Sequence, residues 1–304
     1  MNVLAPAGPQ AQAIADIAWV LFIGAALITA GIVALLWRAV RGGPRPVRAR
    51  RWIVGAGLLF PIMVLVLLMG WSQWRARTVM AEPPPDALVI GVTGRLWWWE
   101  VRYRDPAGTA EFHLANEIRV PVGRTVWLGL TSADVIHSVW LPQLAGKMDT
   151  VPGRVNRLVF RVDRAGTYRG QCAEFCGEQH ARMGLHLVAM EPAAFDAWLR
   201  AQAAPARTPQ TPQEVRGQGA FLAQRCNACH SVRGVAEEAN LGPDLTHVGS
   251  RTALGAGTLP NSRAALAQWV AHTQALKPGA RMPDYGRLDT ATVDAIADWL
   301  WSLQ

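Results

Sequence analysis

Two long apolar runs stand out near the start of the chain. Residues 14–37 and 52–74 carry Asp16 as their only charged side chain, and Pro61 interrupts the second run. Each run reaches the ~20 residues that a helix needs to cross a ~30 Å hydrocarbon core. Tryptophans stand near the ends of both runs, where indole rings favour the membrane surface. We therefore predict a two-helix transmembrane hairpin within residues 1–80.

The pattern changes to a period of two after a stiff proline-rich spacer at residues 82–86. Short runs rich in Val, Leu, Trp and Tyr follow; in one of them Leu158, Phe160 and Val162 share a face, as in a half-buried strand. Turn signals containing Gly and Pro separate the runs. This pattern predicts an all-β sandwich or barrel over residues 86–200, with strands expected at 88–92, 95–104, 117–131 and 157–162.

The last third of the chain has the period of helices. A low-complexity linker at residues 201–212 precedes it. Thr211 can cap the next helix, with a proline directly after it and Glu214 at the capping-box position. Asp289 can cap the final helix, whose apolar positions form one core-facing stripe: Val293, Ile296, Ala297, Leu300 and Trp301. We predict an all-α domain over residues 213–304.

The charge distribution argues for a membrane topology and against nucleic acid. The net charge is +8, but the excess is concentrated in the first 85 residues, which hold eight arginines against Asp16 and Glu82. Six of these arginines stand between the apolar runs, in residues 38–51. Loops of this kind remain in the cytoplasm, so both termini and all later domains are expected on the outer side. A cleaved signal peptide remains an alternative for the first run.

The first pair of cysteines stands in a cluster of soft ligands. Cys172, Cys176, His180 and Met183 follow the spacing C-x3-C-x3-H-x2-M. The cysteine pair alone is compatible with a disulfide, half of a zinc site or a core position. Thiolate, imidazole and thioether together are the ligand set of copper electron-transfer sites, and zinc seldom recruits methionine. His137, 35 residues earlier at a predicted strand end, can meet the cluster at one end of a sandwich.

The second pair of cysteines forms a different motif. Cys226, Cys229 and His230 give C-x-x-C-H, the attachment motif of c-type haem, although C-x-x-C by itself is also typical of redox and zinc sites. Met282 is the only methionine after residue 230 and stands in a loop between predicted helices. Histidine and methionine are the axial pair of cytochromes c. The rival ligands for the sixth position are His247 and His272.

The segment His137 to Trp140, followed by the Cys-x-Glu-x-Cys-x3-His-x2-Met cluster, resembles the binuclear copper A site of cytochrome c oxidase subunit II. The segments 147–154 and 97–99 share this resemblance, which covers about residues 10–200. It implies a cupredoxin fold. The implied ligands are two bridging thiolates, two imidazoles, an axial thioether and a main-chain carbonyl, from Cys172, Cys176, His137, His180, Met183 and Glu174 in that order.

Other roles follow from the same resemblance. The Glu174 carboxylate would face a magnesium ion shared with the catalytic subunit, and Trp97 would receive electrons at the surface. Residues 213–304, including the segment 241–245, resemble a class I cytochrome c. There Cys226 and Cys229 would carry the haem covalently.

The order of hairpin, copper domain and haem domain resembles subunit II of bacterial caa-type oxidases, in which the donor cytochrome is fused to the acceptor. The resemblance implies an electron-transfer subunit that passes electrons from haem c through copper A to subunit I, where dioxygen is reduced with proton pumping. The implied partners are subunits I and III, membrane lipid, and a cytochrome c or bc complex as donor. The expected location is the bacterial inner membrane, with the redox domains on the periplasmic side. A copper A nitric oxide reductase subunit and a membrane-tethered carrier without an oxidase are the alternatives.

Overall fold

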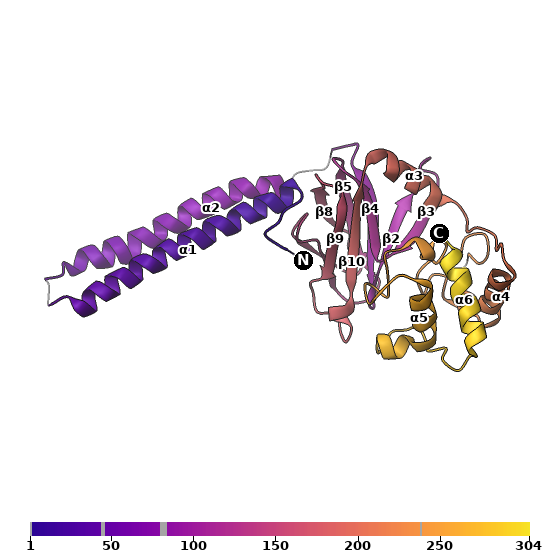
Figure 1. The fold of residues 1–304 in the computed structure, drawn as a ribbon. Helices are drawn as coiled ribbons and strands as arrows, with labels where there is room; N and C mark the ends of the chain where they lie inside the picture. Colours follow the sequence, from indigo (N-terminus) through magenta and orange to yellow (C-terminus); the bar gives the residue numbers. More distant parts are fainter. Residues whose placement is uncertain (1, 44–45, 80–83, 238) are drawn as a thin grey trace.

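The chain folds into three parts that follow one another along the molecule (Figure 1). The computed structural model describes residues 2–43, 46–79, 84–237 and 239–304. Arg45 of the arginine-rich loop, together with Glu82 and Pro83 of the proline-rich spacer, lies outside these ranges. In Figure 1 a helical hairpin projects from one side of a β-sandwich, and a small helical domain packs on the other side.

The hairpin consists of two long, exposed, apolar helices. Helix α1 spans Pro9–Arg41. The second helix begins as a π-helix at Arg51–Leu59 and continues as α2 over Phe60–Val79. Both helices are longer than the sequence pattern predicted, and both are long and apolar enough to span a membrane. The change in hydrogen bonding falls next to Pro61, which has no backbone N–H to donate.

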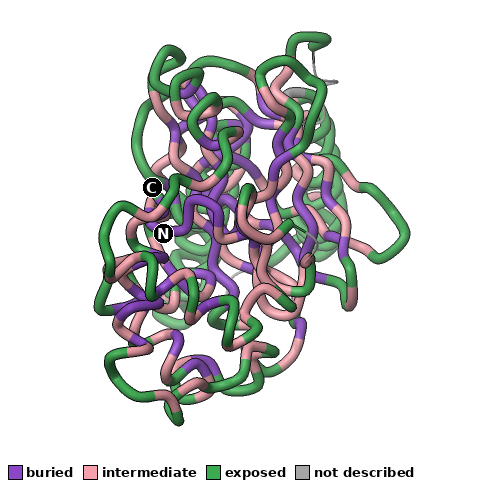
Figure 2. The backbone as a smooth tube through the Cα atoms, turned by 90° about the vertical axis from the view of Figure 1, so that its right-hand side faces the viewer, coloured by how far each residue is buried: buried purple, intermediate pink, exposed green. Residues whose placement is uncertain are grey.

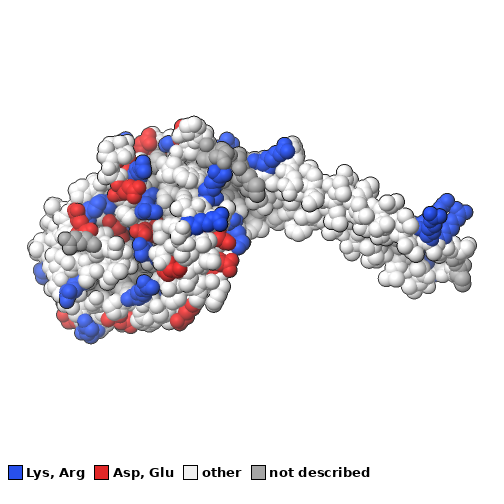
Figure 3. Space-filling model, turned by 180° about the vertical axis from the view of Figure 1, so that it is seen from behind, with Lys and Arg blue, Asp and Glu red and all other residues white. Residues whose placement is uncertain are grey.

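The helices expose a continuous apolar surface, as expected of lipid-facing segments. Figure 3 shows the hairpin almost free of charge along its length, with basic side chains gathered at its far tip. Asp16 and Arg75 form an ion pair between the two helices. The tip includes Arg38 and Arg41, in the last turn of α1.

The segment before α1 is attached to the β-sandwich. The Ala7 N–H donates to the Gln143 carbonyl at 2.7 Å, and the Ala7 carbonyl accepts from the Asp163 N–H at 2.9 Å. The Gln10 side chain accepts a hydrogen bond from the Arg161 N–H at 3.2 Å. The start of the chain therefore lies at the end of the hairpin that adjoins the sandwich, opposite the arginine-rich tip.

Two five-stranded sheets form the sandwich (Figure 1). One sheet has the order β3-β2-β1-β5-β8 and the other has the order β4-β10-β9-β6-β7. The strands are β1 Leu88–Arg95, β2 Trp98–Arg104, β3 Glu111–Ala115, β4 Glu117–Pro121, β5 Thr125–Ser132, β6 His137–Trp140, β7 Lys147–Thr150, β8 Asn156–Arg161, β9 Gly166–Cys172 and β10 Gly184–Met190. The pairs β1–β5 and β4–β10 are parallel, while the other pairs are antiparallel.

The sandwich core confirms the alternation seen in the sequence. Side chains that point inward from both sheets are fully buried, among them Trp99, Val101, Leu128 and Phe160. Figure 2 shows the buried segments running through the interior and the exposed ones around its rim. The expected strand at 117–131 is two strands in different sheets, because the turn at Gly123, with φ of 80°, ends the first one. His137 was expected to close a strand, but it opens β6 after a bend.

The helical domain follows α3, Pro192–Ala203, which takes up the first residues of the expected linker. Its helices are α4 Pro212–Ala223, α5 Arg263–Leu276 and α6 Thr290–Ser302, with a short pair of strands at β11 Ala253–Leu254 and β12 Leu259–Pro260. Thr211 caps α4 and Asp289 caps α6 through their side chains, as predicted. Phe221 and Trp299 meet edge to face at 4.9 Å in the core between α4 and α6.

Candidate metal centres

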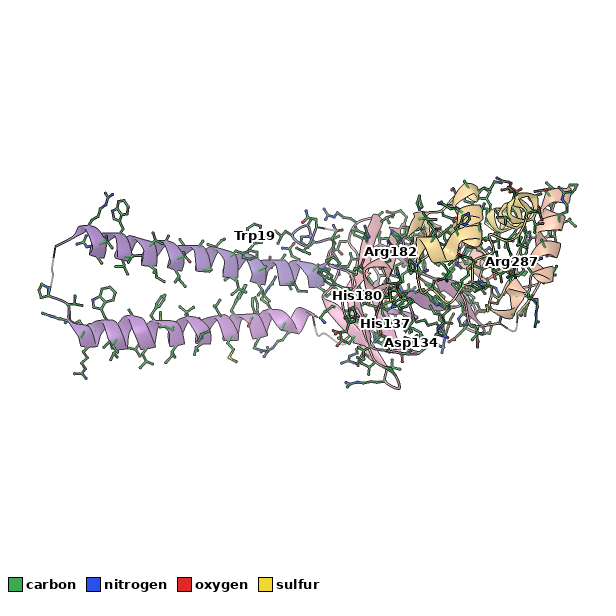
Figure 4. The ribbon with its side chains drawn as sticks, turned by 90° about the horizontal axis from the view of Figure 1, so that it is seen from below. Trp19, Asp134, His137, His180, Arg182 and Arg287 are labelled. Carbon is green, nitrogen blue, oxygen red and sulfur yellow. The ribbon has the colours of Figure 1, made fainter. Side chains whose placement is uncertain are left out.

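The first candidate site is built on the loop between β9 and β10, which contains the short 3-10 helix His180–Arg182. Strands β6 and β9 are paired with Val139 opposite Cys172. This register brings His137, at the start of β6, next to the end of β9. The Cys172 N–H donates to the Met183 carbonyl at 3.0 Å and closes the loop. Figure 4 shows His137 and His180 in the same region of the sandwich.

The structure brings the predicted copper ligands together. The Cys176 sulfur lies 3.8 Å from the Cys172 sulfur, 3.8 Å from the Met183 sulfur and 3.6 Å from His180 Nδ1. The Glu174 carbonyl lies 3.3 Å from the Cys172 sulfur. Ligand atoms of His137 and both cysteines lie within 4.8 Å of one another. Since a disulfide requires a bond of ~2.05 Å, the two thiols are free for metal binding.

His137 has the environment of a ligand held by an outer partner. Its Nε2 lies 2.8 Å from Asp134 Oδ1, and its Nδ1 is buried with no hydrogen-bond partner among the described residues. An unpaired buried nitrogen is costly unless it has another role. A carboxylate on the far nitrogen is typical of metal-bound histidines. The donor set and this unpaired atom together fit a copper site.

Proton equilibria in the cluster favour metal binding. The hydrogen bond from Cys176 lowers the pKa of the Cys172 thiol, and the same interaction raises the pKa of the Cys176 thiol. The two thiols therefore lose their protons one after the other, Cys172 first. Metal must displace the second proton, because thiolates are the ligand form. Burial raises the pKa of Asp134, but hydrogen bonds from His137 and Leu96 lower it below its usual value, so Asp134 stays ionised.

We expect Asp134→Asn to weaken copper retention by ~10–100-fold, the usual cost of losing an outer-shell carboxylate. The amide keeps the shape of the side chain but removes the charge that holds the imidazole. Copper content of the purified complex after dialysis against a chelator measures the effect. Asp163→Asn, at an exposed ion pair with Arg161, is the matched control. Equal copper retention in both variants would contradict this role for Asp134.

The Glu174 carboxylate points away from the sulfur cluster. It lies 3.6 Å from Lys147 Nζ and is well exposed, while its carbonyl faces Cys172. Trp97 lies on the other side of the loop, where its indole N–H donates to the Cys176 carbonyl at 2.8 Å. The run of three tryptophans does not lie on one strand: Trp97 is in the turn between β1 and β2 and is half-buried, whereas Trp99 of β2 is core. The strand expected at 95–104 is therefore interrupted by this turn.

The second candidate site lies in the helical domain. Cys226–Ala228 form a 3-10 turn directly after α4. His230 Nδ1 lies 2.7 Å from the Pro243 carbonyl, which fixes the ring and leaves Nε2 for iron. Gly242 approaches that ring so closely that an added Cβ would lie 2.7 Å from it. Cys226 and Met282 pack against the same hydrophobic cluster. These residues fit a c-type haem.

The two rival residues, His247 and His272, are less suited to bind the haem iron than Met282. His247 Nδ1 lies 2.7 Å from the Gln304 carbonyl, and its Nε2 lies 3.0 Å from the Ala204 carbonyl. Both ring nitrogens are therefore engaged. His272 is exposed at a kink within α5. Met282 remains the favoured sixth ligand.

Sequence reasoning did not identify Lys277, a buried residue at the contact between the two sites. Its ammonium reaches the carbonyls of Trp97 and Arg182. A single lysine in a loop forms no recognisable sequence motif, so nothing in the neighbouring sequence indicated its role.

Comparisons with known proteins agree with both sites. Residues 105–190 match the family model of the periplasmic domain of cytochrome c oxidase subunit II, and residues 214–304 match that of cytochrome c. The cytochrome c oxidase subunit 2 of Alkalihalophilus pseudofirmus is 32% identical over all of this chain and 91% of its own length. That of Bacillus subtilis is 27% identical over 86% of this chain and 77% of its own length. The solved periplasmic domain of subunit II from Bradyrhizobium japonicum is 33% identical, with a TM-score of 0.37, and covers 40% of this chain and 97% of that chain.

The hairpin, the cupredoxin-like sandwich and the cytochrome domain together define a membrane-anchored electron-transfer protein with two redox domains. The whole-chain match specifies it further. The chain belongs to the cytochrome c oxidase subunit 2 family, in the form that carries a C-terminal cytochrome c domain. The predicted family and fold class are confirmed.

Proposed function

We propose that this chain accepts electrons from an external cytochrome c or bc complex and delivers them to subunit I of the oxidase. In this proposal they pass from haem c to copper A within the chain, and dioxygen is reduced to water in subunit I with proton pumping. When bound, the two groups supply one-electron chemistry, and the protein supplies position and electrostatics. The observation that carries the proposal is the convergence of two thiols, two imidazoles and a thioether at one end of the sandwich, from the segment 172–183 and from His137 at the start of β6.

In the copper domain the two thiolates would be ligands of the metal centre. Cys176 is central because its sulfur contacts Cys172, His180 and Met183. His137 would bind through the nitrogen that faces away from Asp134. Met183 and the Glu174 carbonyl would complete the set. The ligands lie on a closed loop between paired strands and on the adjoining strand β6, so the site need not rearrange when its charge changes.

In the cytochrome domain Cys226 and Cys229 would hold haem c by thioether bonds. His230 would bind the iron from one side, with its ring oriented by the Pro243 carbonyl. Met282 would bind from the other side, and a His/Met pair gives a high potential. Burial lowers the pKa of His230 despite the hydrogen bond to Pro243, which keeps the imidazole in its neutral ligand form.

Trp97 would carry electrons between the domains. Its indole N–H is hydrogen-bonded to the Cys176 carbonyl, and its ring lies close to Gly279 of the loop that bears Met282. The resemblance implied electron entry at the surface, and the contacts of Trp97 with Lys277 and Gly279 support entry at the boundary with the cytochrome domain. Electrons from the fused domain would therefore enter here without a diffusional encounter.

The opposite rim of the copper loop would face subunit I. Val135, Ile136 and Phe175 are exposed there, and Phe175 is 77% exposed. Exposed apolar groups of this kind mark interaction surfaces. The Glu174 carboxylate, with Lys147 beside it, would hold magnesium at this contact. The helices of the hairpin would contact membrane lipid and subunit III.

We infer a periplasmic location for both redox domains in a bacterial inner membrane. The arginine-rich tip of the hairpin (Figure 3) would remain in the cytoplasm. The N-terminal segment is hydrogen-bonded to the sandwich through Ala7 and Gln10, which supports the same outer location for that end. This attachment also favours retention of the first helix over its removal as a signal peptide.

Replacing Arg45, Arg48, Arg50 and Arg51 with glutamine should weaken the orientation preference and give a mixed population, because the positive charge of the loop sets the topology. Protease access to the loop in intact spheroplasts measures the inverted fraction. Arg216 and Arg225, both exposed in the cytochrome domain, serve as control positions. A loop that is cleaved from outside in the unsubstituted protein would refute the orientation.

The proposed function is tested on the purified complex. We expect copper, haem c and subunits I and III to copurify with this chain, and reduced cytochrome c to drive oxygen consumption. Nitric oxide reduction without oxygen reduction, or a chain isolated alone with both cofactors, would refute it.

A further inference from the structure

The cytochrome domain is docked on the copper domain through directed polar contacts. Glu117 of β4 is buried and accepts hydrogen bonds from the Thr252 N–H at 2.8 Å and the Thr252 hydroxyl at 2.6 Å. The Gly184 N–H of β10 donates to the Ala256 carbonyl at 2.9 Å. Bonds of this kind define one relative orientation, whereas freely moving domains are the default for joined units.

One side chain of this interface lies between the two candidate metal sites. Lys277 follows α5 and precedes Met282 by five residues. It is only 3% exposed. Its ammonium donates to the carbonyls of Trp97 at 2.8 Å, Arg182 at 2.8 Å and Gly255 at 2.9 Å. Two of these acceptors belong to the copper domain and one to the cytochrome domain.

The contacts of Lys277 account for its burial. A buried ammonium is costly unless its donors are satisfied, and an ammonium has three donors, all of which are used here. Burial lowers the pKa of this lysine to about 7, which reflects the cost of keeping a charged group out of water. The three carbonyl acceptors offset part of that cost.

The two acceptors in the copper domain both flank the metal loop. Trp97 is hydrogen-bonded to the Cys176 carbonyl, and Arg182 directly precedes Met183. The Arg182 side chain in turn donates to the Leu276 carbonyl, at the end of α5, at 2.6 Å. In the loop that follows Lys277, Gly279 has φ of 77°, and a Cβ added there would lie 3.5 Å from the Trp97 ring. The loop of Met282 is thus held against the residues that surround Cys176 and Met183.

We propose that Lys277 is a positioning residue that holds the haem loop against the copper loop and thereby maintains the geometry for electron transfer between them. This inference rests on the proposed function. Lys277 acts through the backbone of Trp97 and Arg182 and touches neither metal. The docked arrangement is the competent state, and the transfer rate scales with its population.

Lys277→Met tests the inference in the purified oxidase complex. Methionine keeps the length of the side chain but removes all three donors. We expect transfer from haem c to copper A, followed after photoreduction of haem c by a ruthenium complex, to slow at least ~10-fold, because the competent fraction falls. That factor corresponds to about 1.4 kcal/mol of docking free energy. The two midpoint potentials and both absorption spectra should not change.

Arg287→Met is the matched control, since it removes the same charge from an exposed position of the cytochrome domain that Figure 4 places away from the copper-site residues. We expect no change in rate. Hydrogen exchange at the Gly184 N–H gives a second readout, which should accelerate in Lys277→Met alone. If that variant fails to accumulate, Lys277→Gln, which keeps one donor group, takes its place with the same expected direction.

The outcomes separate the two proposals. A variant with both spectra intact, an unchanged transfer rate and unchanged exchange at Gly184 would overturn the role of Lys277 alone. Absence of the copper or haem spectrum in the unsubstituted complex would overturn the proposed function. A slower rate accompanied by a shifted midpoint potential would also overturn the positioning role, since the change would then act on a metal site.

Discussion

Substituting serine for Cys176 is expected to abolish the near-infrared absorption and the electron paramagnetic resonance signature of binuclear copper A, and to reduce oxygen consumption to background. The Cys176 sulfur lies within 3.8 Å of Cys172 and Met183 and 3.6 Å from His180, so it is the shared centre of the ligand set. A serine hydroxyl is a hard, protonated donor that cannot replace a bridging thiolate.

The controls separate loss of copper from loss of fold. Haem c in the variant should still be reduced by the external donor, because its ligands lie in another domain. Ala181→Ser adds a hydroxyl at an exposed position of the same loop and should keep both signatures. A variant Cys176→Ser with an unaltered copper spectrum would remove the basis of the assignment.

Replacing Met282 with alanine is expected to lower the midpoint potential of haem c by on the order of 0.1 V, a fraction of the range that axial ligands span. Loss of the thioether removes the ligand that stabilises the reduced iron. The sulfur-to-iron charge-transfer band of the oxidised haem should disappear. Spectroelectrochemical titration of the purified complex measures both effects.

His272→Gln is the matched control, because it removes the exposed rival ligand and should leave potential and band unchanged. Survival of the charge-transfer band in Met282→Ala would show that another residue binds the iron. With a lowered haem potential, electron flow into copper A becomes more favourable, while reduction by the external donor becomes less so. Steady-state oxygen consumption should therefore become limited by donor oxidation.

Local signals in the sequence were sufficient to predict the three-part architecture. The length of the apolar runs predicted the hairpin, and the turn signals and caps at Thr211 and Asp289 located helices that the structure contains. The strand boundary was less accurate at His137, because a bend precedes it in which the Ser132 hydroxyl donates to the Val135 carbonyl. No glycine or proline marks this bend in residues 132–136.

The copper-ligand cluster was predictable because most of its members are close in sequence. Cys172 to Met183 fit on one loop, so their spacing alone indicated the chemistry. His137 joined the prediction through its place at a predicted strand end, which the family resemblance then supported, and the register of β6 against β9 explains its position. Asp134 belongs to no sequence motif, and only its contact with the His137 imidazole, at 2.8 Å, indicates that it orients the ring.

By itself, the sequence determined which groups this protein brings to electron transfer: a membrane hairpin, a soft-metal cluster and a haem-attachment motif, each encoded in a short segment with its own periodicity or spacing. Only the tertiary structure decided how the two redox domains meet. The placement of Trp97 under the haem loop and the burial of Lys277 depend on contacts between residues up to 180 positions apart. No local pattern specifies such contacts, since carbonyl acceptors are present at every residue and only folding selects which of them a lysine reaches.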